Sequence, residues 1–185
     1  METEILLQRC RRGDELAWEA LVRRYQGRIF ALAYHYLRDR EEARDVAQET
    51  FVRIYRGLES FEASGSFTAW AVRVARNCAL DRIRHLKARL APTPLDDETE
   101  ARVECGQAPD EPAQESKRRD LIERALDRMT AINREMILLK EIQGLKQQEI
   151  ADLLSIPLGT VKARTNRARL ELARWVLDLD PSYGA

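Results

Sequence analysis

The chain has 185 residues, 44% of them hydrophobic and 34% charged, so it can form one large or two small domains and is too apolar to be disordered throughout. Its 31 basic residues equal its 31 acidic residues, and a net charge of zero by itself argues against a nucleic-acid binder. No apolar run approaches the roughly 20 residues of a membrane span and no signal peptide opens the sequence, so we expect a cytoplasmic protein.

The charges are unevenly distributed along the chain. Met1–Leu90 holds 17 basic and 13 acidic residues, Ala91–Ser116 holds 1 and 8, and Lys117–Ala185 holds 13 and 10. An acidic segment therefore masks two mildly basic ones. The three cysteines are far apart and follow no metal-ligand or disulfide spacing, so we expect no metal and no cofactor.

A periodicity of 3.6 residues runs along most of the chain, and few segments alternate as strands do. This pattern predicts an all-α protein of two small helical domains. The first helix covers 2–12 and ends at Gly13, and Asp14 is a good N-cap for an apolar helix or helix pair that reaches Leu37, with a possible bend at Gly27. We expect the aromatic residues of this stretch to serve packing.

Asp39 is predicted to cap the next helix, whose buried stripe begins at Ala43 and ends at Leu58. Four polar residues fall together outside that stripe: Asp45, Gln48, Glu49 and Arg53. Such a face is usually solvated surface, and the pattern of this helix taken alone favours that interpretation.

A polar loop at 59–66 contains Gly65 and precedes a long helix predicted for 67–90. One side of this helix is apolar and the other is basic, with Asp81 as its carboxylate. The basic side is either a soluble surface or a face for phosphates and bases. The candidate residues for nucleic acid in this region are Ser64, Ser66, Arg73, Arg76, Asn77 and Arg82.

Residues 91–116 are acidic, rich in Pro and poor in large apolar residues, which predicts a flexible linker. Residues 117–178 form the second predicted domain, and 179–185 a polar tail, so the first domain covers 1–90. Within the second domain we expect helices at 117–129 and 132–142, the latter ended by Gly144.

Leu145–Arg169 then reads as two short helices joined by a tight turn, with the second helix starting near Pro157. This arrangement is typical of a DNA-reading helix-turn-helix. Val161, Thr165 and Ala168 share the inner face of the second helix with Leu172. The candidate DNA contacts are Lys162, Ala163, Arg164, Asn166, Arg167 and Arg169.

Three of these motifs together make the chain resemble the sigma-70 family of bacterial transcription initiation factors, specifically its extracytoplasmic-function group. DREEARDVAQETFVRIYRGLESF (39–61) is similar to region 2.2 of the family, and FTAWAVRVARNCALDRIR (67–84) to regions 2.3 and 2.4. GLKQQEIADLLSIPLGTVKARTNRARLEL (144–172) is similar to region 4.2. Three motifs in this order, with an acidic linker between them, are far more specific than a helix-turn-helix alone.

The resemblance implies a role for each face. Asp45, Gln48 and Glu49, with Arg53 beside them, would bind core RNA polymerase, and the loop with the 67–90 helix would capture the −10 promoter element as a single strand. Lys162, Ala163, Asn166 and Arg167 would read the −35 element in the major groove, while Arg164 and Arg169 grip phosphates. The family also implies an anti-sigma factor, often membrane-bound, that would hold the protein at the inner membrane face.

The chain departs from the family pattern at a few positions. Thr165 stands where a branched apolar residue is usual, Met129-Thr130 replaces a common Leu-Pro, and Ala163 stands where a hydroxyl is frequent. Two other functions stay open: a decoy that mimics a sigma factor to titrate its inhibitor, and a stand-alone helix-turn-helix repressor. We expect no enzyme and no small-molecule substrate, since His35 and His85 have no evident nucleophile or metal partner in the sequence.

Overall fold

The computed structural model describes residues 2–61, 65–90 and 113–184, and the regular structure in these ranges is entirely helical. The chain divides into two compact units, Met1–Asp97 and Glu98–Ala185. The prediction of an all-α protein with two helical domains is therefore confirmed. Most of the predicted linker, together with Ser64 and Cys105, lies outside the described residues. Within the described ranges, no helix combines the length and the apolar composition needed to cross a membrane.

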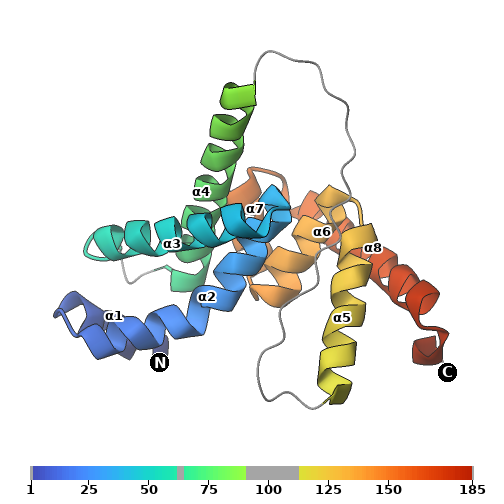
Figure 1. The fold of residues 1–185 in the computed structure, drawn as a ribbon, viewed down its shortest axis with the longest axis horizontal. Coiled ribbons are helices and arrows are strands. Elements are labelled where there is room, and N and C mark those ends of the chain that lie inside the picture. The colour runs from blue at the N-terminus through green and yellow to red at the C-terminus, as the bar shows by residue number, and fades with distance from the viewer. Residues whose placement is uncertain (1, 62–64, 91–112, 185) are drawn as a thin grey trace. The chain divides into compact units, whose positions relative to one another are not determined.

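Unit 1 contains α1 (Glu2–Arg11), α2 (Glu15–Leu37), α3 (Arg40–Gly57) and α4 (Phe67–Leu90) (Figure 1). Both predicted N-caps are confirmed, because the Asp14 carboxylate accepts a hydrogen bond from Ala17 N at 3.1 Å and that of Asp39 one from Glu42 N at 2.9 Å. Gly27 lies in the middle of α2 without interrupting it.

A cluster of mostly small side chains lies in the core of unit 1 where its long helices meet. In Figure 1, α3 runs alongside α2 and α4 crosses them. Partly buried aromatic rings, including Phe30, Tyr34 and Tyr36, pack around this centre. Small side chains let helix backbones approach closely, so the centre fixes how α3 and α4 face each other. Its buried members are Ala33, Ala43, Val46, Cys78 and Ala79.

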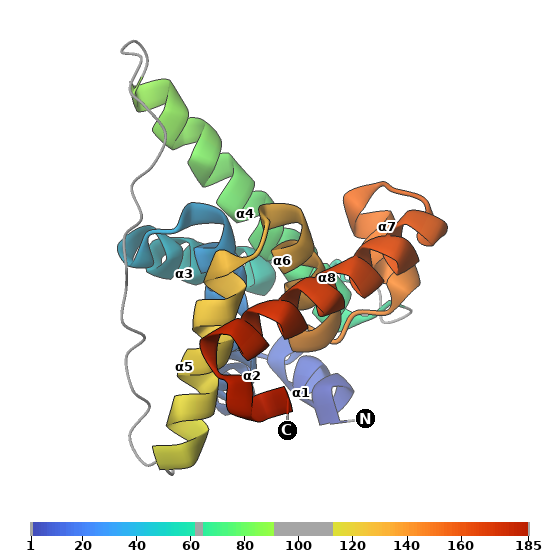
Figure 2. The ribbon, with the colours of Figure 1, turned by 90° about the vertical axis from the view of Figure 1, so that its right-hand side faces the viewer.

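Unit 2 contains α5 (Ala113–Arg128), α6 (Ala131–Ile137), a π-helical turn (Leu138–Ile142), α7 (Gln147–Leu154), α8 (Leu158–Leu179) and a final 3₁₀ turn (Pro181–Gly184). Figure 2 shows α8 as the long helix of this unit, with α7 beside its N-terminal half and α5 beside its C-terminal half. Apolar side chains from α5 to α8 fill the space between these helices.

Three features of unit 2 differ from the sequence prediction. The helix expected from Lys117 begins at Ala113, so residues 113–116 are helical rather than part of the linker. The helix expected over 132–142 changes to a π-helical turn, in which Gln143 N donates to Leu138 O at 2.8 Å. The predicted tail is partly ordered, since Asp180 accepts hydrogen bonds from Ser182 and the Tyr183 hydroxyl accepts one from Arg118 Nε at 3.3 Å.

Thr165 is buried although it carries a hydroxyl at a position where the family usually has an apolar residue. Its side chain is 1% exposed, and Oγ1 donates to Val161 O at 2.8 Å, one turn earlier in α8. Thr50 in α3 does the same with Val46 O at 2.7 Å. A buried hydroxyl that bonds to its own helix leaves no polar atom unsatisfied, so threonine can replace valine in these cores.

His35 gives unit 1 a pH-dependent stability. Burial, together with the charge of Arg38, lowers the pKa of His35 from 6.5 to about 4. Because the folded pKa is the lower one, the unfolded chain takes up the proton first, and stability is lost as the pH falls from about 6.5 towards 4. We expect this residue alone to lower the unfolding free energy by about 2 to 3 kcal/mol between pH 7 and pH 4.

Urea unfolding at both pH values measures the unfolding free energy of the parent chain and of the variant His35→Phe. The phenylalanine variant should lose much less stability on acidification than the parent. His85→Phe, which removes an exposed histidine from α4, is the matched control and should behave like the parent. Equal acid sensitivity in all three proteins would contradict the role of His35.

Candidate functional site

The polar face of α3 is exposed as predicted. Asp45, Gln48, Glu49 and Arg53 all lie on the solvent side, while Ala43, Val46, Thr50 and Ile54 are buried on the opposite side. Two carboxylates and an amide lie within about one turn of each other, which suits recognition by arginine side chains of another protein.

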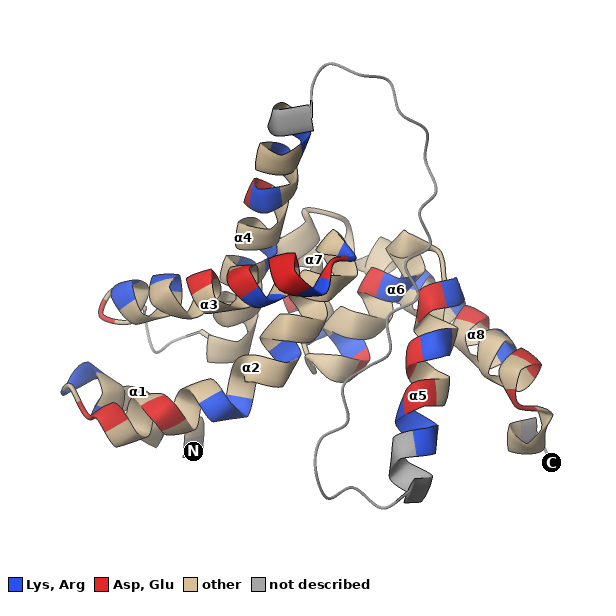
Figure 3. Cartoon of the chain, viewed as in Figure 1, with Lys and Arg blue, Asp and Glu red and all other residues tan. Residues whose placement is uncertain are grey.

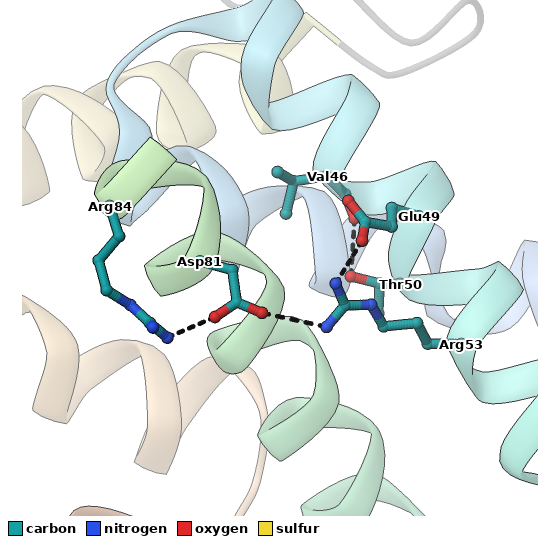
Figure 4. Close-up of polar contacts among 6 residues, drawn as sticks. All are labelled: Val46, Glu49, Thr50, Arg53, Asp81 and Arg84. Atoms are coloured by element: carbon teal, nitrogen blue, oxygen red, sulfur yellow. Dashed lines mark hydrogen bonds and ion pairs between the residues drawn. The ribbon is translucent and has the colours of Figure 1, made fainter. Parts of the chain in front are cut away.

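Arg53 connects this face to α4. Its guanidinium donates to Glu49 on its own helix and, at 3.2 Å, to Asp81 on α4, while Arg84 donates to the other oxygen of Asp81. Figure 4 shows Arg53 between the two carboxylates. Asp81, the single carboxylate of α4 noted in the sequence, thus joins two helices.

Arg82 makes a second bridge between the same helices. Its Nε donates to Glu42, and Nη2 lies 3.8 Å from Asp45 Oδ2. Arg82 is predicted for the −10 surface and Asp45 for the polymerase surface, and the fold brings the two side chains together. No periodicity along one helix could reveal this, because the pairing depends on how α3 and α4 cross.

The basic face of α4 is the second candidate surface, and Figure 3 shows blue segments recurring along this helix. Arg73 and Asn77 are exposed and lie one turn apart. Arg76 is partly buried, since its Nε donates to the Tyr36 hydroxyl at 2.9 Å and its guanidinium lies 5.8 Å from the centre of that ring. Tyr36 therefore orients Arg76, a role that the sequence analysis missed by treating the aromatic as packing.

A hollow lies at the start of α4. Its volume is about 340 Å³. Ser66, one of the predicted −10 residues, lies on its wall and caps α4, because its Oγ accepts from Ala69 N at 3.2 Å. Arg73 and Asn77 lie about 10 and 16 Å further along the helix axis, at 1.5 Å per residue. The lining residues are Thr3, Glu4, Leu7, Gln8, Arg11, Tyr25, Phe61, Gly65, Ser66, Phe67 and Thr68.

Aromatic rings support the wall of this hollow. Phe61 contacts Phe67 and Trp70 with ring centres 5.7 and 5.0 Å apart, and Tyr25 meets Phe67 edge-on at 5.2 Å. Gly57, at the end of α3, leaves room for Trp70, since a Cβ there would lie 3.1 Å from the indole ring. The loop therefore leaves α3 and enters α4 against a packed aromatic base.

The helix-turn-helix of unit 2 is built by α7 and α8. Ser155 adopts a left-handed conformation with φ 54°, and Ile156 N donates to Ala151 O at 3.1 Å, which closes the end of α7. Pro157 is the residue before α8, as expected near a helix start, but α8 continues to Leu179 and is not the short helix that was predicted.

The two faces of α8 follow the prediction. Val161, Thr165 and Ala168 are buried. Arg164 is partly buried, and the other predicted DNA contacts are exposed: Lys162, Ala163, Asn166, Arg167 and Arg169. Arg169 is also paired within the chain, because its Nε and Nη2 both donate to Glu141 Oε1, at 2.9 and 2.7 Å.

Comparisons with known proteins match both units. Residues 21–89 match the family described as Sigma-70 region 2, and residues 119–172 match Sigma-70, region 4. The chain is 32% identical over 179 residues to ECF RNA polymerase sigma factor SigW of Bacillus subtilis, which covers 94% of this chain and 96% of SigW. The chain belongs to the extracytoplasmic-function (ECF) group of the sigma-70 family.

Two further comparisons agree with this membership. The ECF chain is 34% identical over 173 residues to the RNA polymerase sigma-H factor of Pseudomonas aeruginosa, covering 89% of this chain and 88% of that one. Its fold is similar to that of CnrH, solved in complex with the cytosolic domain of CnrY, with a TM-score of 0.61, 25% identity and coverage of 97% and 99% of the two chains. The family resemblance drawn from the three motifs is therefore confirmed.

Glu171 is a structural residue of the ECF chain that the sequence analysis did not single out. It lies on α8, and its carboxylate accepts from Thr130 N at 2.8 Å, from Thr130 Oγ1 at 3.2 Å and from Asn133. These donors form the start of α6, where a negative charge is stabilising. Glu171 therefore fixes α6 against the helix that carries the predicted −35 contacts.

The charge of Glu171 is expected to contribute to the stability of unit 2. Burial raises the pKa of Glu171, but hydrogen bonds from Asn133 and Thr130 outweigh burial and lower this pKa below its ordinary value of 4.5. The contribution is thus present above about pH 4.5 and lost as the pH falls below it. We expect Glu171→Gln to lower the unfolding free energy by about 1 to 2 kcal/mol at pH 7, and by less at pH 3.5.

Urea unfolding at the two pH values measures both effects. Asp120→Asn removes a carboxylate that is 67% exposed on α5 and faces Arg124 at 3.7 Å, and should change stability little. A loss at Glu171→Gln that does not depend on pH would show that the charge is not what holds α6.

Proposed function

We propose that this ECF sigma factor binds core RNA polymerase through the exposed face of α3 and contacts a promoter at two places. Unit 1 captures the −10 element as a single strand along the start and basic side of α4, and unit 2 reads the −35 element as duplex with α8. The observation that carries the proposal is that the predicted contact residues of α3, and all but Arg164 of those of α8, are exposed, with a buried stripe behind them.

The α3 face would bind a basic surface of the polymerase. Asp45 and Glu49 supply the charges, and Gln48 can donate and accept between them. Each carboxylate is already close to an arginine of this chain, Asp45 to Arg82 and Glu49 to Arg53. These side chains are about half exposed, so the internal pairs contribute little free energy and an incoming guanidinium can share the carboxylates.

Single-stranded DNA fits the surface at the start of α4. A base exposes its Watson–Crick edge only when it is unstacked, so a hollow of base-accepting size at the start of a helix that carries cationic side chains further along favours melted over paired DNA. Ser66 would contact a base in the hollow, while Arg73, Arg76, Asn77 and Arg82 would follow the backbone and neighbouring bases. Tyr36 would keep Arg76 in place for this contact.

Duplex DNA fits the exposed side of α8. Lys162 and Arg167 suit guanine, Asn166 suits adenine, and Ala163 can make apolar contact with a thymine methyl group. Each good bidentate pair discriminates by about 1 to 3 kcal/mol. Arg164 and Arg169 would contact phosphates, which requires Arg169 to exchange Glu141 for DNA.

An anti-sigma protein is the further partner that we propose, held at the inner face of the membrane. It would keep the factor inactive by covering the surfaces described above. The similar protein CnrH was solved with the cytosolic domain of CnrY bound, which supports a protein partner of this kind.

Run-off transcription with core polymerase tests the function directly. Core enzyme mixed with the purified chain should give promoter-dependent transcripts from a genomic fragment library, whereas core enzyme alone should not. If no fragment gives a product, the chain is not an initiation factor. Tight duplex binding without polymerase would instead favour a repressor, and inhibitor binding without any transcription would favour a decoy.

Reversing the charge of the α3 face tests its role in polymerase binding. Asp45→Lys combined with Glu49→Lys should weaken binding to core polymerase by at least about a hundredfold, because lysines would face a basic surface. Both side chains are exposed, so the helical content should be unchanged. Affinity is measured by competition for fluorescently labelled core enzyme, with circular dichroism as the check on folding.

Glu15→Lys combined with Glu19→Lys is the matched control. It makes the same change of charge at exposed positions of α2. Its affinity for core polymerase should remain within about threefold of the parent, because exposed charges outside an interface act weakly. If both double variants lose affinity equally, net charge rather than the α3 face controls binding.

A further inference from the structure

Arg11, at the end of α1, binds the chain segment that leads into the −10 loop. Its Nε donates to Leu58 O at 3.1 Å, and its Nη2 donates to Phe61 O. Helix α1 lies outside residues 21–89, the part of unit 1 that matches the family. A side chain from beyond that region thus contacts backbone on both sides of the turn that follows α3.

The two carbonyl groups need a donor. Leu58 is the C-cap of α3, where the last carbonyls of a helix have no partner within it, and the partial negative charge of that end favours a cation. A guanidinium is a planar group with several N–H donors, so one arginine can hold two carbonyls at once. Lysine has a single nitrogen and cannot copy this geometry.

Arg11 is itself fixed in position. Leu7 and Cys10, on the inner side of α1, are each 6% exposed. The turn after α1 uses Gly13 in a left-handed conformation with φ +80°, and Arg9 Nε is bonded to Asp14 Oδ2 at 2.8 Å. Since Asp14 also caps α2, this bond connects the last turn of α1, which carries Arg11, to the start of α2.

We propose that Arg11 is a positioning residue for −10 recognition. By holding the carbonyls of Leu58 and Phe61, it keeps the Phe61 ring against Trp70 and forms one wall of the hollow before DNA arrives. Because this wall is already formed, DNA binding costs less conformational entropy than it would if the wall had to become ordered on binding. The inference rests on the proposed function, in which the −10 single strand is captured at this hollow.

The test uses the full chain with Trp18→Phe and Trp175→Phe, so that Trp70 is the remaining tryptophan. Arg11→Met keeps an apolar stem and removes the donors, Arg11→Lys restores charge and one donor group, and Arg12→Met removes the charge of the exposed neighbouring arginine as a control. Quenching of Trp70 fluorescence by acrylamide, a neutral quencher, measures in the absence of DNA and polymerase whether Phe61 still covers the indole.

The second readout is DNA binding by the assembled holoenzyme. The probe is a labelled non-template oligonucleotide carrying the −10 element of a promoter found by run-off transcription. We expect Arg11→Met to raise the Trp70 quenching constant about twofold and to weaken oligonucleotide binding about tenfold. Arg11→Lys should recover part of both, Arg12→Met should match the parent, and affinity for core polymerase should not change.

The outcomes separate this inference from the function on which it rests. If the parent holoenzyme does not bind the oligonucleotide, the proposed −10 function fails, whatever the quenching shows. If the parent binds but Arg11→Met equals Arg12→Met, the positioning role is overturned and the function stands. Weaker DNA binding with unchanged Trp70 quenching would also overturn it, because Arg11 would then contact the DNA directly. If Arg11→Met does not fold, the same two readouts are compared between Arg11→Lys and Arg12→Met. Impaired values for Arg11→Lys alone support the positioning role, and equal values overturn it.

Discussion

The close approach of α3 and α4 is the constraint on which the proposed function of unit 1 depends. Alanines at the crossing, among them Ala43 and Ala79, are fully buried and let the helix backbones come near each other. A larger side chain at either position would separate the helices and move their exposed faces apart. The spacing of the proposed polymerase and DNA surfaces is therefore determined by the small residues behind them.

This geometry gives the bridging arginines two possible sets of partners. In the isolated chain Arg53 pairs with Glu49 on α3 and Asp81 on α4, and Arg82 pairs with Glu42 and Asp45 on α3. In the proposed promoter complex Arg82 would face phosphates instead. Pairs at this exposure contribute little free energy, so exchanging one partner for another is easy. The same weakness makes the bridges poor sources of stability, which in unit 1 comes from the apolar side chains buried where the helices cross.

Local signals in the sequence predicted the helices well. The signals for helix starts, tight turns and apolar stripes each depend on residues within a few positions of one another. The caps Asp14 and Asp39 and the limits of α4 were therefore predicted correctly. The π-helical turn was missed because consecutive buried residues from Met136 to Leu139 look like any apolar helix. The length of α8 was underestimated because the helix-turn-helix pattern ends at Arg169, whereas the helix continues to Leu179.

The candidate site was predictable only as a set of separate faces. Which residues are exposed on α3 and α8 follows from helical periodicity, and the structure agrees. The pairing of Arg82 with Glu42, of Arg76 with Tyr36 and of Arg11 with the end of α3 joins residues 40 to 50 positions apart. Contacts of that range depend on the packing of whole helices, which the periodicity of each helix does not reveal.

The pairing of Arg169 with Glu141 has a consequence for how α8 meets DNA. A cation that already has a carboxylate neighbour attracts a DNA phosphate less strongly, and moving it onto DNA leaves that carboxylate beside a polyanion. Counting the basic side chains of α8 therefore overstates the positive potential that the helix presents to a distant duplex. Under the proposed −35 role, long-range attraction would therefore be weak, and α8 would discriminate among sequences mainly after another contact has brought it to the groove.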